Sequence, residues 1–124
     1  MSAEPISLSQ IPLGQIAHAR SGDKGNHANI GVIAYTPAGY AWLVRELSAE
    51  RVAEFFAGLG LSRVERFELP RLGALNFLLY DALAGGASLS LRIDTQGKLL
   101  STAIAELPLP RPDDLDSMLR RTAP

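Results

Sequence analysis

Residues 13–35 read LGQIAHARSGDKGNHANIGVIAY, and the architecture expected for this 124-residue chain starts from them. Apolar residues alternate with small or polar residues at both ends of this stretch, over residues 13–20 and again over residues 29–35. The alternation predicts two strands, because successive side chains of a strand point to opposite faces. The segment between them, residues 21–28, is polar and too long for a tight hairpin turn, which indicates an extended connecting loop.

Two amphipathic helices are predicted in the middle of the chain. Ser48 is a residue type that caps helix N-termini, and apolar residues follow it at the spacing of one buried helix face. They are Val52, Phe55, Phe56 and Leu59, with Gly58 and Gly60 as a stop signal. The same spacing predicts a second helix over residues 72–83, which ends at the glycine pair 85–86. Its apolar face consists of Leu72, Leu75, Leu79, Ala82 and Leu83.

The remaining segments complete a sheet. Residues 63–69 are predicted as a strand that ends at Pro70, and residues 87–94 show the clearest alternation of apolar and polar side chains. A turn over residues 94–98 leads into a further strand over residues 99–105. The order of elements predicts an α+β, ferredoxin-like sandwich, in which two helices cover one face of an antiparallel or mixed sheet of about five strands.

The composition predicts a single domain over residues 1–124. Its core spans about residues 12–107, and residues 108–124 form a proline-rich tail with a short helix after Asp113. The 12 Lys and Arg residues nearly balance the 13 Asp and Glu residues, so the chain has no electrostatic footprint for nucleic acid or an anionic membrane. The absence of cysteine excludes disulfides, thiolate nucleophiles and thiolate-bound metals, and no cofactor is predicted.

The longest uncharged stretch is residues 25–44, which at 20 residues has about the span of a bilayer. It does not predict a membrane helix, because two asparagines, a histidine, Pro37 and three glycines would leave polar groups unsatisfied in lipid. The first twenty residues lack a basic start followed by an apolar run, so no secretory signal is expected. A cytoplasmic location is therefore the expectation.

Polar residues that could hold a ligand are concentrated between residues 20 and 29. Backbone amides around Gly22 and Gly25 would form an anion-binding nest, with Arg20 and Lys24 neutralising a phosphate or carboxylate. The candidate ligand-binding residues are Arg20, Ser21, Gly22, Lys24, Gly25, Asn26 and Asn29, together with Asn76 from the second predicted helix. In the alternative interpretation, the loop satisfies its own polar groups through turns and an ion pair of Asp23 with Lys24 or Arg20.

Asp23 and His27 are the candidate catalytic residues. Either would act as acid or base on an acyl-CoA or a 2-oxo or hydroxy acid, while a nearby asparagine stabilises an enolate or oxyanion. A metal site of His18, Asp23 and His27 is not predicted, because the spacing matches no common site. In the second predicted helix, Tyr80 lies one turn beyond Asn76, so the two would present a phenol and an amide to the same side.

The chain resembles a known family in the motifs ARSGDKGN (residues 19–26) and ANIG (residues 28–31). They are similar to the signature of the small ferredoxin-fold domain at the C-terminus of acyclic terpene utilisation (AtuA-like) proteins, with the domain expected to stand alone here. The resemblance covers roughly residues 12–107 and continues through LPRLGALNF (69–77), ALAGG (82–86) and SLRID (90–94). One departure is His27, where the family more often has a smaller or acidic residue.

The resemblance implies an accessory or ligand-binding module that is associated with the catabolism of acyl-CoA esters or terpenoid acids. The implied partners are a larger AtuA-like protein and an anionic small molecule or CoA ester. Because sheets of this kind often pair face to face, a homo-oligomer is also expected. Two alternatives stay open: a small enzyme that uses acid–base chemistry on an acyl-CoA or carboxylic acid, and an oligomerisation module.

Overall fold

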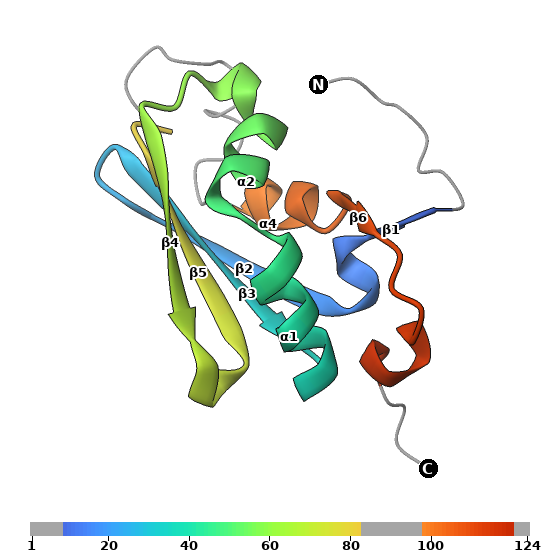
Figure 1. Ribbon diagram of the computed structural model, residues 1–124. Coiled ribbons are helices and arrows are strands. Elements are labelled where there is room, and N and C mark those ends of the chain that lie inside the picture. The colour runs from blue at the N-terminus through green and yellow to red at the C-terminus, as the bar shows by residue number, and fades with distance from the viewer. Residues whose placement is uncertain (1–8, 83–97, 121–124) are drawn as a thin grey trace.

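Figure 1 shows the computed structural model, which describes residues 9–82 and 98–120. Its centre is a four-stranded antiparallel sheet with the strand order β2-β3-β5-β4. The strands are β2 (Ala17–Lys24), β3 (His27–Ala34), β4 (Arg63–Leu69) and β5 (Ala74–Tyr80). Because β3 and β4 are both antiparallel to the strand between them, β5, the helical connection from β3 to β4 is a split β-α-β crossover. The predicted α+β, ferredoxin-like fold is confirmed.

The first two strands of this sheet form one long hairpin. β2 and β3 pair along their whole length, as far as Lys24 opposite His27, so only Gly25 and Asn26 are left to make the turn. Gly25 has a φ of 64°, which glycine adopts without steric strain. A glycine at the first of two turn positions is typical of the type II′ turns that close tight hairpins.

This hairpin corrects the predicted loop over residues 21–28. The strand predicted from residue 13 begins later, after a 3-10 turn η1 (Leu13–Gln15), and both strands then continue through the polar segment. Polar residues do not end these strands, because their side chains reach solvent or, for Ser21, a helix backbone, while their own backbone bonds to the neighbouring strand. Side-chain polarity therefore gave a wrong position for the turn.

The hairpin of β4 and β5 contains both a confirmed and a wrong prediction. The strand predicted over residues 63–69 is confirmed, whereas the predicted helix over residues 72–83 is wrong, since this region contains β5. The buried side chains Leu75, Phe77 and Leu79 alternate with partly exposed ones, which is the period of a strand. Leu75 and Leu79 also have helical spacing, and pairing of β5 with a strand on each side decides between the two.

Three of the described helices lie on one face of the sheet (Figure 1): α1 (Pro37–Glu46), α2 (Ala49–Phe55) and α4 (Lys98–Ile104). The predicted cap at Ser48 is confirmed, because its Oγ accepts a hydrogen bond from Arg51 N at 3.0 Å. α2 ends before a 3-10 turn, η2 (Ala57–Leu59). The strand predicted over residues 99–105 is wrong, since α4 occupies this segment and buries Leu100 and Ile104, one helical turn apart.

A two-stranded ribbon joins distant parts of the chain. β1 (Gln10–Pro12) pairs antiparallel with β6 (Pro108–Pro110), and Trp42 Nε1 of α1 donates a hydrogen bond to Pro110 O at 3.0 Å. The chain then forms a 3-10 turn, η4 (Leu115–Met118), where a short helix is predicted after Asp113. Leu109 and Met118 are buried, so this tail contributes to the hydrophobic core.

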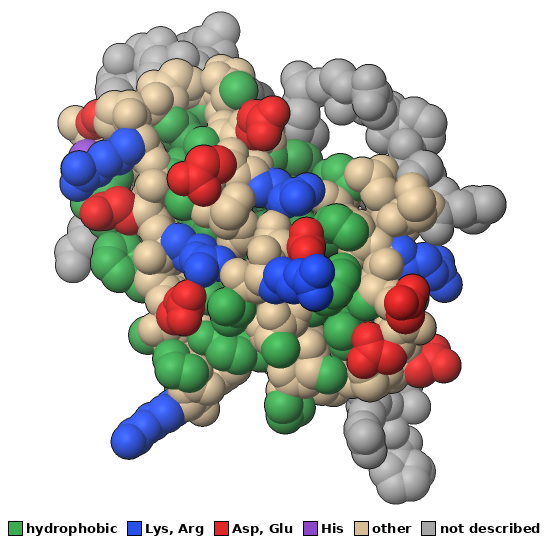
Figure 2. All heavy atoms as spheres, viewed as in Figure 1, with side chains coloured by type: hydrophobic (Ala, Val, Ile, Leu, Met, Phe, Trp, Pro, Cys, Tyr) green, Lys and Arg blue, Asp and Glu red, His purple; other side chains and the backbone are tan. Residues whose placement is uncertain are grey.

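The core lies between the sheet and the helices. Its fully buried side chains include Ile30, Leu43, Leu47, Val52, Leu75, Phe77 and Leu79. On the face that Figure 2 presents, Lys and Arg side chains are interleaved with Asp and Glu side chains, so no broad patch of one charge covers it. No described helix has the length and apolar character that crossing a membrane requires. The predicted strand over residues 87–94 and the glycine pair 85–86 lie outside the described residues.

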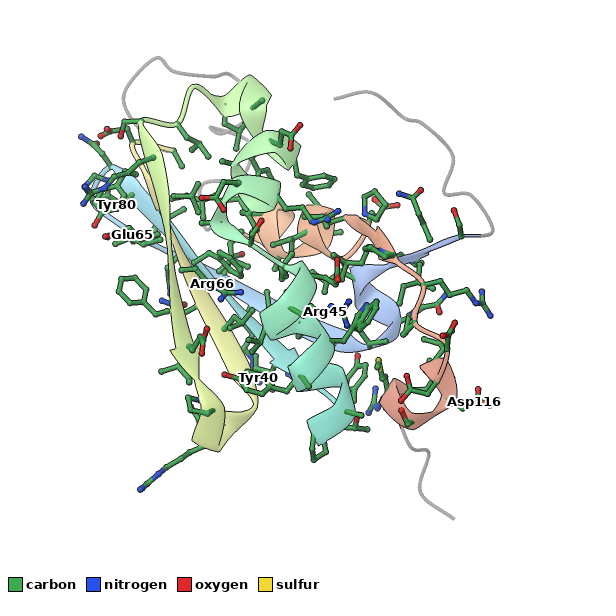
Figure 3. All side chains as sticks on the ribbon, in the orientation of Figure 1. Tyr40, Arg45, Glu65, Arg66, Tyr80 and Asp116 are labelled. Carbon is green, nitrogen blue, oxygen red and sulfur yellow. The ribbon has the colours of Figure 1, made fainter. Side chains whose placement is uncertain are left out.

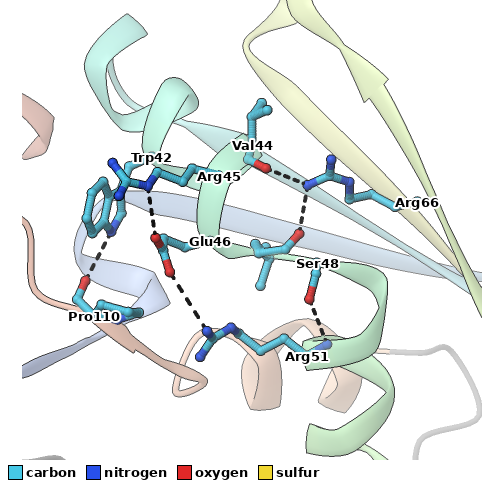
Figure 4. A network of polar contacts seen from close by, with 9 residues as sticks. Trp42, Val44, Arg45, Glu46, Ser48, Arg51, Arg66 and Pro110 are labelled. Atoms are coloured by element: carbon cyan, nitrogen blue, oxygen red, sulfur yellow. Dashed lines mark hydrogen bonds and ion pairs between the residues drawn. The ribbon is translucent and has the colours of Figure 1, made fainter.

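Polar contacts hold the end of α1 in place. Arg66 reaches from β4 toward α1 (Figure 3), and its Nη1 donates to Val44 O at 2.9 Å and to Leu47 O at 3.0 Å. On the other side of the junction, Glu46 Oε1 lies 3.8 Å from Arg51 Nη2 (Figure 4). Because Arg66 belongs to the sheet, these contacts fix the α1–α2 corner against the strand that follows it.

Candidate functional site

Several candidate residues lie on the face of the sheet that the described helices leave uncovered. Side chains alternate across a strand, and buried Ile30 and Phe77 face the helices, so the residues next to them face away. We call this surface the outer face. It consists of His18, Arg20 and Gly22 of β2, His27, Asn29, Gly31 and Ile33 of β3, Arg63, Glu65, Phe67 and Leu69 of β4, and Asn76, Leu78 and Tyr80 of β5.

Two asparagines and two glycines form the middle of the outer face. Asn29 Nδ2 donates a hydrogen bond to Asn76 Oδ1 at 3.4 Å, which links β3 to β5. Gly22 pairs with Asn29, and Gly31 pairs with Asn76. A Cβ on Gly22 would lie 3.1 Å from Asn29 Oδ1, whereas a Cβ on Gly31 would have its nearest contact, Asn76 Oδ1, at 3.9 Å. Because the two glycines have no side chain, the backbone beside the two asparagine amides is not covered by neighbouring side chains from positions 22 and 31.

The other loop candidates do not join this cluster. Ser21 and Asp23 are the neighbours of Gly22 in β2, and side chains alternate along a strand. They therefore lie on the side of the sheet where the helices pack. Ser21 Oγ accepts a hydrogen bond from Ser101 N at 3.2 Å, which attaches the beginning of α4 to β2. Gly25 and Asn26 form the exposed turn at the end of the hairpin. The predicted ligand-binding residues are thus spread over two faces and a turn.

The charged candidates of the hairpin are also separated. Arg20 is exposed on the outer face, and Lys24 stands opposite His27 in the register, next to the turn. Among the described side chains, neither Arg20 nor Asp23 forms an ion pair. The ion pair between Arg20 and Asp23 that a self-satisfied loop would use is therefore not formed, because the two side chains leave the strand on opposite sides.

His27 has a clear structural contact at the end of the sheet. Its Nδ1 accepts a hydrogen bond from Asp81 N at 2.9 Å, and its ring packs edge-on against Tyr80 with centroids 5.0 Å apart. Asp81 has a φ of 62°, a left-handed conformation that costs a non-glycine residue about 1–2 kcal/mol. Ser62 Oγ donates to Asp81 Oδ2 at 2.6 Å. His27 and Ser62 together hold the chain in this strained conformation where β5 ends.

Tyr80 belongs to a polar cluster that the sequence did not predict. Its hydroxyl donates to Glu65 Oε1 (Figure 3), and the Arg63 guanidinium lies 4.1 Å from the centre of its ring. The hydrogen bond with Tyr80 raises the pKa of the Arg63 guanidinium above its ordinary value, so this group stays charged. Tyr80 and Asn76 do share a face, but in a strand four residues span about 13 Å, so they are not adjacent as a helix would make them.

A pocket of about 320 Å³ lies at the other end of the sheet, open to solvent on one side. It is lined by the end of β3, the start of α1 and the 3-10 turn η3 (Pro70–Leu72) that joins β4 to β5. Tyr40 and Arg71 line it, and neither is among the site residues predicted from the sequence. The Tyr40 hydroxyl is buried and has no hydrogen-bond partner among the described residues. Arg71 lies within the family-like motif LPRLGALNF, but no pattern in the sequence marks either residue as part of a site.

Within residues 9–82 and 98–120, no three His, Asp or Glu side chains gather as a metal site requires. The fold and the outer face define a class: a small ferredoxin-like α+β sandwich in which the described helices cover one face of the sheet. The chain belongs to the AtuA ferredoxin-like domain family, whose sequence model matches residues 11–110. Comparison with curated proteins and with solved structures gave no match.

Proposed function

We propose that this chain is a non-catalytic accessory module that binds a larger AtuA-like protein through its outer face, in the catabolism of acyl-CoA esters or related carboxylic acids. One observation carries the proposal: the described helices cover one face of the sheet, while Arg20, Asn29 and Asn76 from the family-like motifs lie on the other. A four-stranded sheet face offers the broad, continuous surface that a protein–protein interface needs.

The composition of the outer face supports a protein partner. Phe67 is 45% exposed and pairs with Asn76, and Leu69, 41% exposed, lies two residues further along β4 on the same face. Exposed apolar side chains beside a polar rim are typical of interfaces. Because Gly22 and Gly31 carry no side chain, a partner could approach the sheet closely and bond to the two amides.

The same geometry gives less support to the enzyme alternative. Asp23 and His27 project from opposite faces of the hairpin, so they would not act together on one bound substrate. His27 Nδ1 already accepts a hydrogen bond from the backbone, which limits its use as a base at that nitrogen. Arg20 is exposed and unpaired among the described side chains, and we propose that it meets an acidic residue of the partner.

Gly31→Val tests this proposal. A Cβ at this strand position meets only ordinary van der Waals contacts, and the two further methyl groups of valine suit a strand and point to the outer face, so we expect the variant to fold. It places bulk in the middle of the outer face, and binding of a larger AtuA-like protein, measured by isothermal titration calorimetry, should weaken by about tenfold or more. Ala41→Leu adds bulk to an exposed position of α1 and should leave the affinity unchanged.

Two further outcomes decide between the alternatives. If the wild-type chain does not bind the larger protein at about 100 μM, or if Gly31→Val and Ala41→Leu bind equally well, the docking proposal is wrong. Sedimentation of the chain alone addresses the oligomerisation module: a dimer that Gly31→Val dissociates would identify a second copy as the occupant of the outer face. Titration with coenzyme A on the wild type and Arg20→Gln tests the CoA ester as a ligand.

A further inference from the structure

We infer that the pocket between α1 and the β4–β5 turn binds a small monocarboxylate, with the Tyr40 hydroxyl and the Arg71 guanidinium as the groups that recognise it. The site is distinct from the outer face and does not depend on the docking proposal. The pocket holds about 320 Å³, which is at the lower end of the range for sites that bind small molecules.

The Tyr40 hydroxyl is the first observation that points to a ligand. Tyr40 extends from α1 toward the β4–β5 hairpin (Figure 3), and it lines the pocket. Its hydroxyl is buried but finds no hydrogen-bond partner among the described residues. Buried polar groups are nearly always paired in folded proteins, because water no longer solvates them. Thr36, also in the lining, uses its hydroxyl to accept from Gly39 N at 3.0 Å, and no described residue bonds to the Tyr40 hydroxyl, which leaves it available to donate to a bound ligand.

The charge of the lining selects an anion. Arg71 is exposed, forms no ion pair among the described side chains, and is the only charged residue of the described lining. A second guanidinium, that of Arg120, lies 5.8 Å from the ring centre of Tyr35, another lining residue. With cations near the pocket and no carboxylate in its lining, a negatively charged ligand is favoured and a cationic one is not. A phenol hydroxyl and a guanidinium are both donors, which matches the acceptors of a carboxylate.

The rest of the lining selects a ligand with an apolar body. Ala34, Pro37, Pro70 and Leu72 contribute apolar surface, and Leu72 is 69% exposed, the highest value among the large hydrophobic side chains described. Inorganic phosphate would leave this apolar surface in water, whereas a short aliphatic chain would cover it. A monocarboxylate with a hydrocarbon chain of a few carbons therefore fits both parts of the pocket.

A titration followed by ¹H–¹⁵N NMR tests this inference with three probes of related shape or charge. Hexanoate should bind in the millimolar range and shift the amide signals of Gly73 and the first residues of α1. Hexanamide keeps the chain but lacks the charge, and inorganic phosphate keeps a charge but lacks the chain. Both should bind about tenfold more weakly than hexanoate. If hexanoate causes no shifts, or if phosphate binds as tightly as hexanoate, the inference is wrong.

Two variants separate a ligand-binding role from a structural one. Tyr40→Phe removes a hydroxyl that has no described partner, so the free protein should keep its melting temperature while hexanoate binds about tenfold more weakly. Arg71→Gln should weaken binding by a similar factor. The matched control is Arg63→Gln, at the opposite end of β4, which should bind like the wild type. Unchanged hexanoate affinity in both pocket variants overturns the inference, whatever the outer face binds.

Discussion

Arg66 shows how much one side chain contributes to the α1–α2 corner. Its Nη1 donates to Val44 O and Leu47 O, and its Nη2 donates to Glu68 Oε2 at 2.9 Å. The last carbonyls of a helix lack partners within the helix, and a positive charge near them is also favoured by the helix dipole. Nothing in the alternation of residues 63–69 indicates this role, because the contact depends on where α1 ends.

We predict that Arg66→Met lowers the free energy of unfolding by about 2 kcal/mol, since it leaves two helix carbonyls without their donor. Arg66→Lys should lose less, because lysine keeps the charge but not the planar group that reaches both carbonyls. Urea denaturation measures both values. The control is Arg45→Met, whose side chain is 75% exposed and should change stability by no more than about 0.5 kcal/mol. Equal losses for Arg66→Met and Arg45→Met would contradict this account.

His27 has a structural role at the same scale. Its ring nitrogen accepts the Asp81 N–H, and Asp81 has a positive φ. A smaller or acidic residue at position 27 would give this N–H a different partner or none. The sequence identified His27 as a candidate catalytic residue, and that role remains a prediction, whereas its structural contact required the fold to bring residues 27 and 81 together.

At the scale of elements, periodicity located most segments but did not always identify their type. Leu75 and Leu79 are four residues apart, which is the spacing of a helix face. Phe77 is also buried, and the three together have the two-residue spacing of a strand. In the same way, Leu100 and Ile104 have helical spacing, although a strand was predicted there. Short apolar runs are ambiguous, because neighbouring elements rather than local propensity decide their conformation. Ser48 was predicted well, because a helix cap is a local interaction.

A matched pair of glycine substitutions tests the element boundaries. Gly73 has a φ of 61° where η3 gives way to β5, so Gly73→Ala should lower the free energy of unfolding by about 1 kcal/mol. Gly31 lies inside β3 without a positive φ and has room for a Cβ. Gly31→Ala should therefore leave stability unchanged or raise it by up to about 1 kcal/mol. Chemical denaturation compares the two, and a greater loss at Gly31 would show that the strand assignment is wrong.

On the scale of the whole molecule, the C-terminal segment is part of the core. Leu109 of β6 is fully buried, so Leu109→Ala should lower the free energy of unfolding by about 2–5 kcal/mol. Leu72→Ala makes the same chemical change at a position that is 69% exposed, and it should change stability by about 0.5 kcal/mol or less. Thermal unfolding followed by circular dichroism measures both. Similar melting temperatures for the two variants would mean that β6 does not contribute to the folded core.

The sequence predicted only some residues of the outer face, and their role in binding stays a prediction. Arg20, Asn29 and Asn76 were identified from residue type and from the family-like motifs, and the sheet places them on its outer face. The pocket with Tyr40 and Arg71 was missed, because its walls come from the end of β3, the start of α1 and the β4–β5 turn. Its chemistry exists only after these distant segments meet, and neither residue is unusual in its local sequence.

The contact between Trp42 and Pro110 supplies the protein with an internal optical reporter. Trp42 is the only tryptophan in the chain, and its indole N–H bonds to the strand β6 near the C-terminal end. Contacts between residues so far apart in sequence require a long loop to close before they form, so we expect this one to form after the local helices. Tryptophan emission therefore reports the docking of β6, whereas far-ultraviolet circular dichroism reports the helices and the main sheet. A delay of the emission change relative to the dichroism change during refolding would measure how long after the main sheet β6 docks.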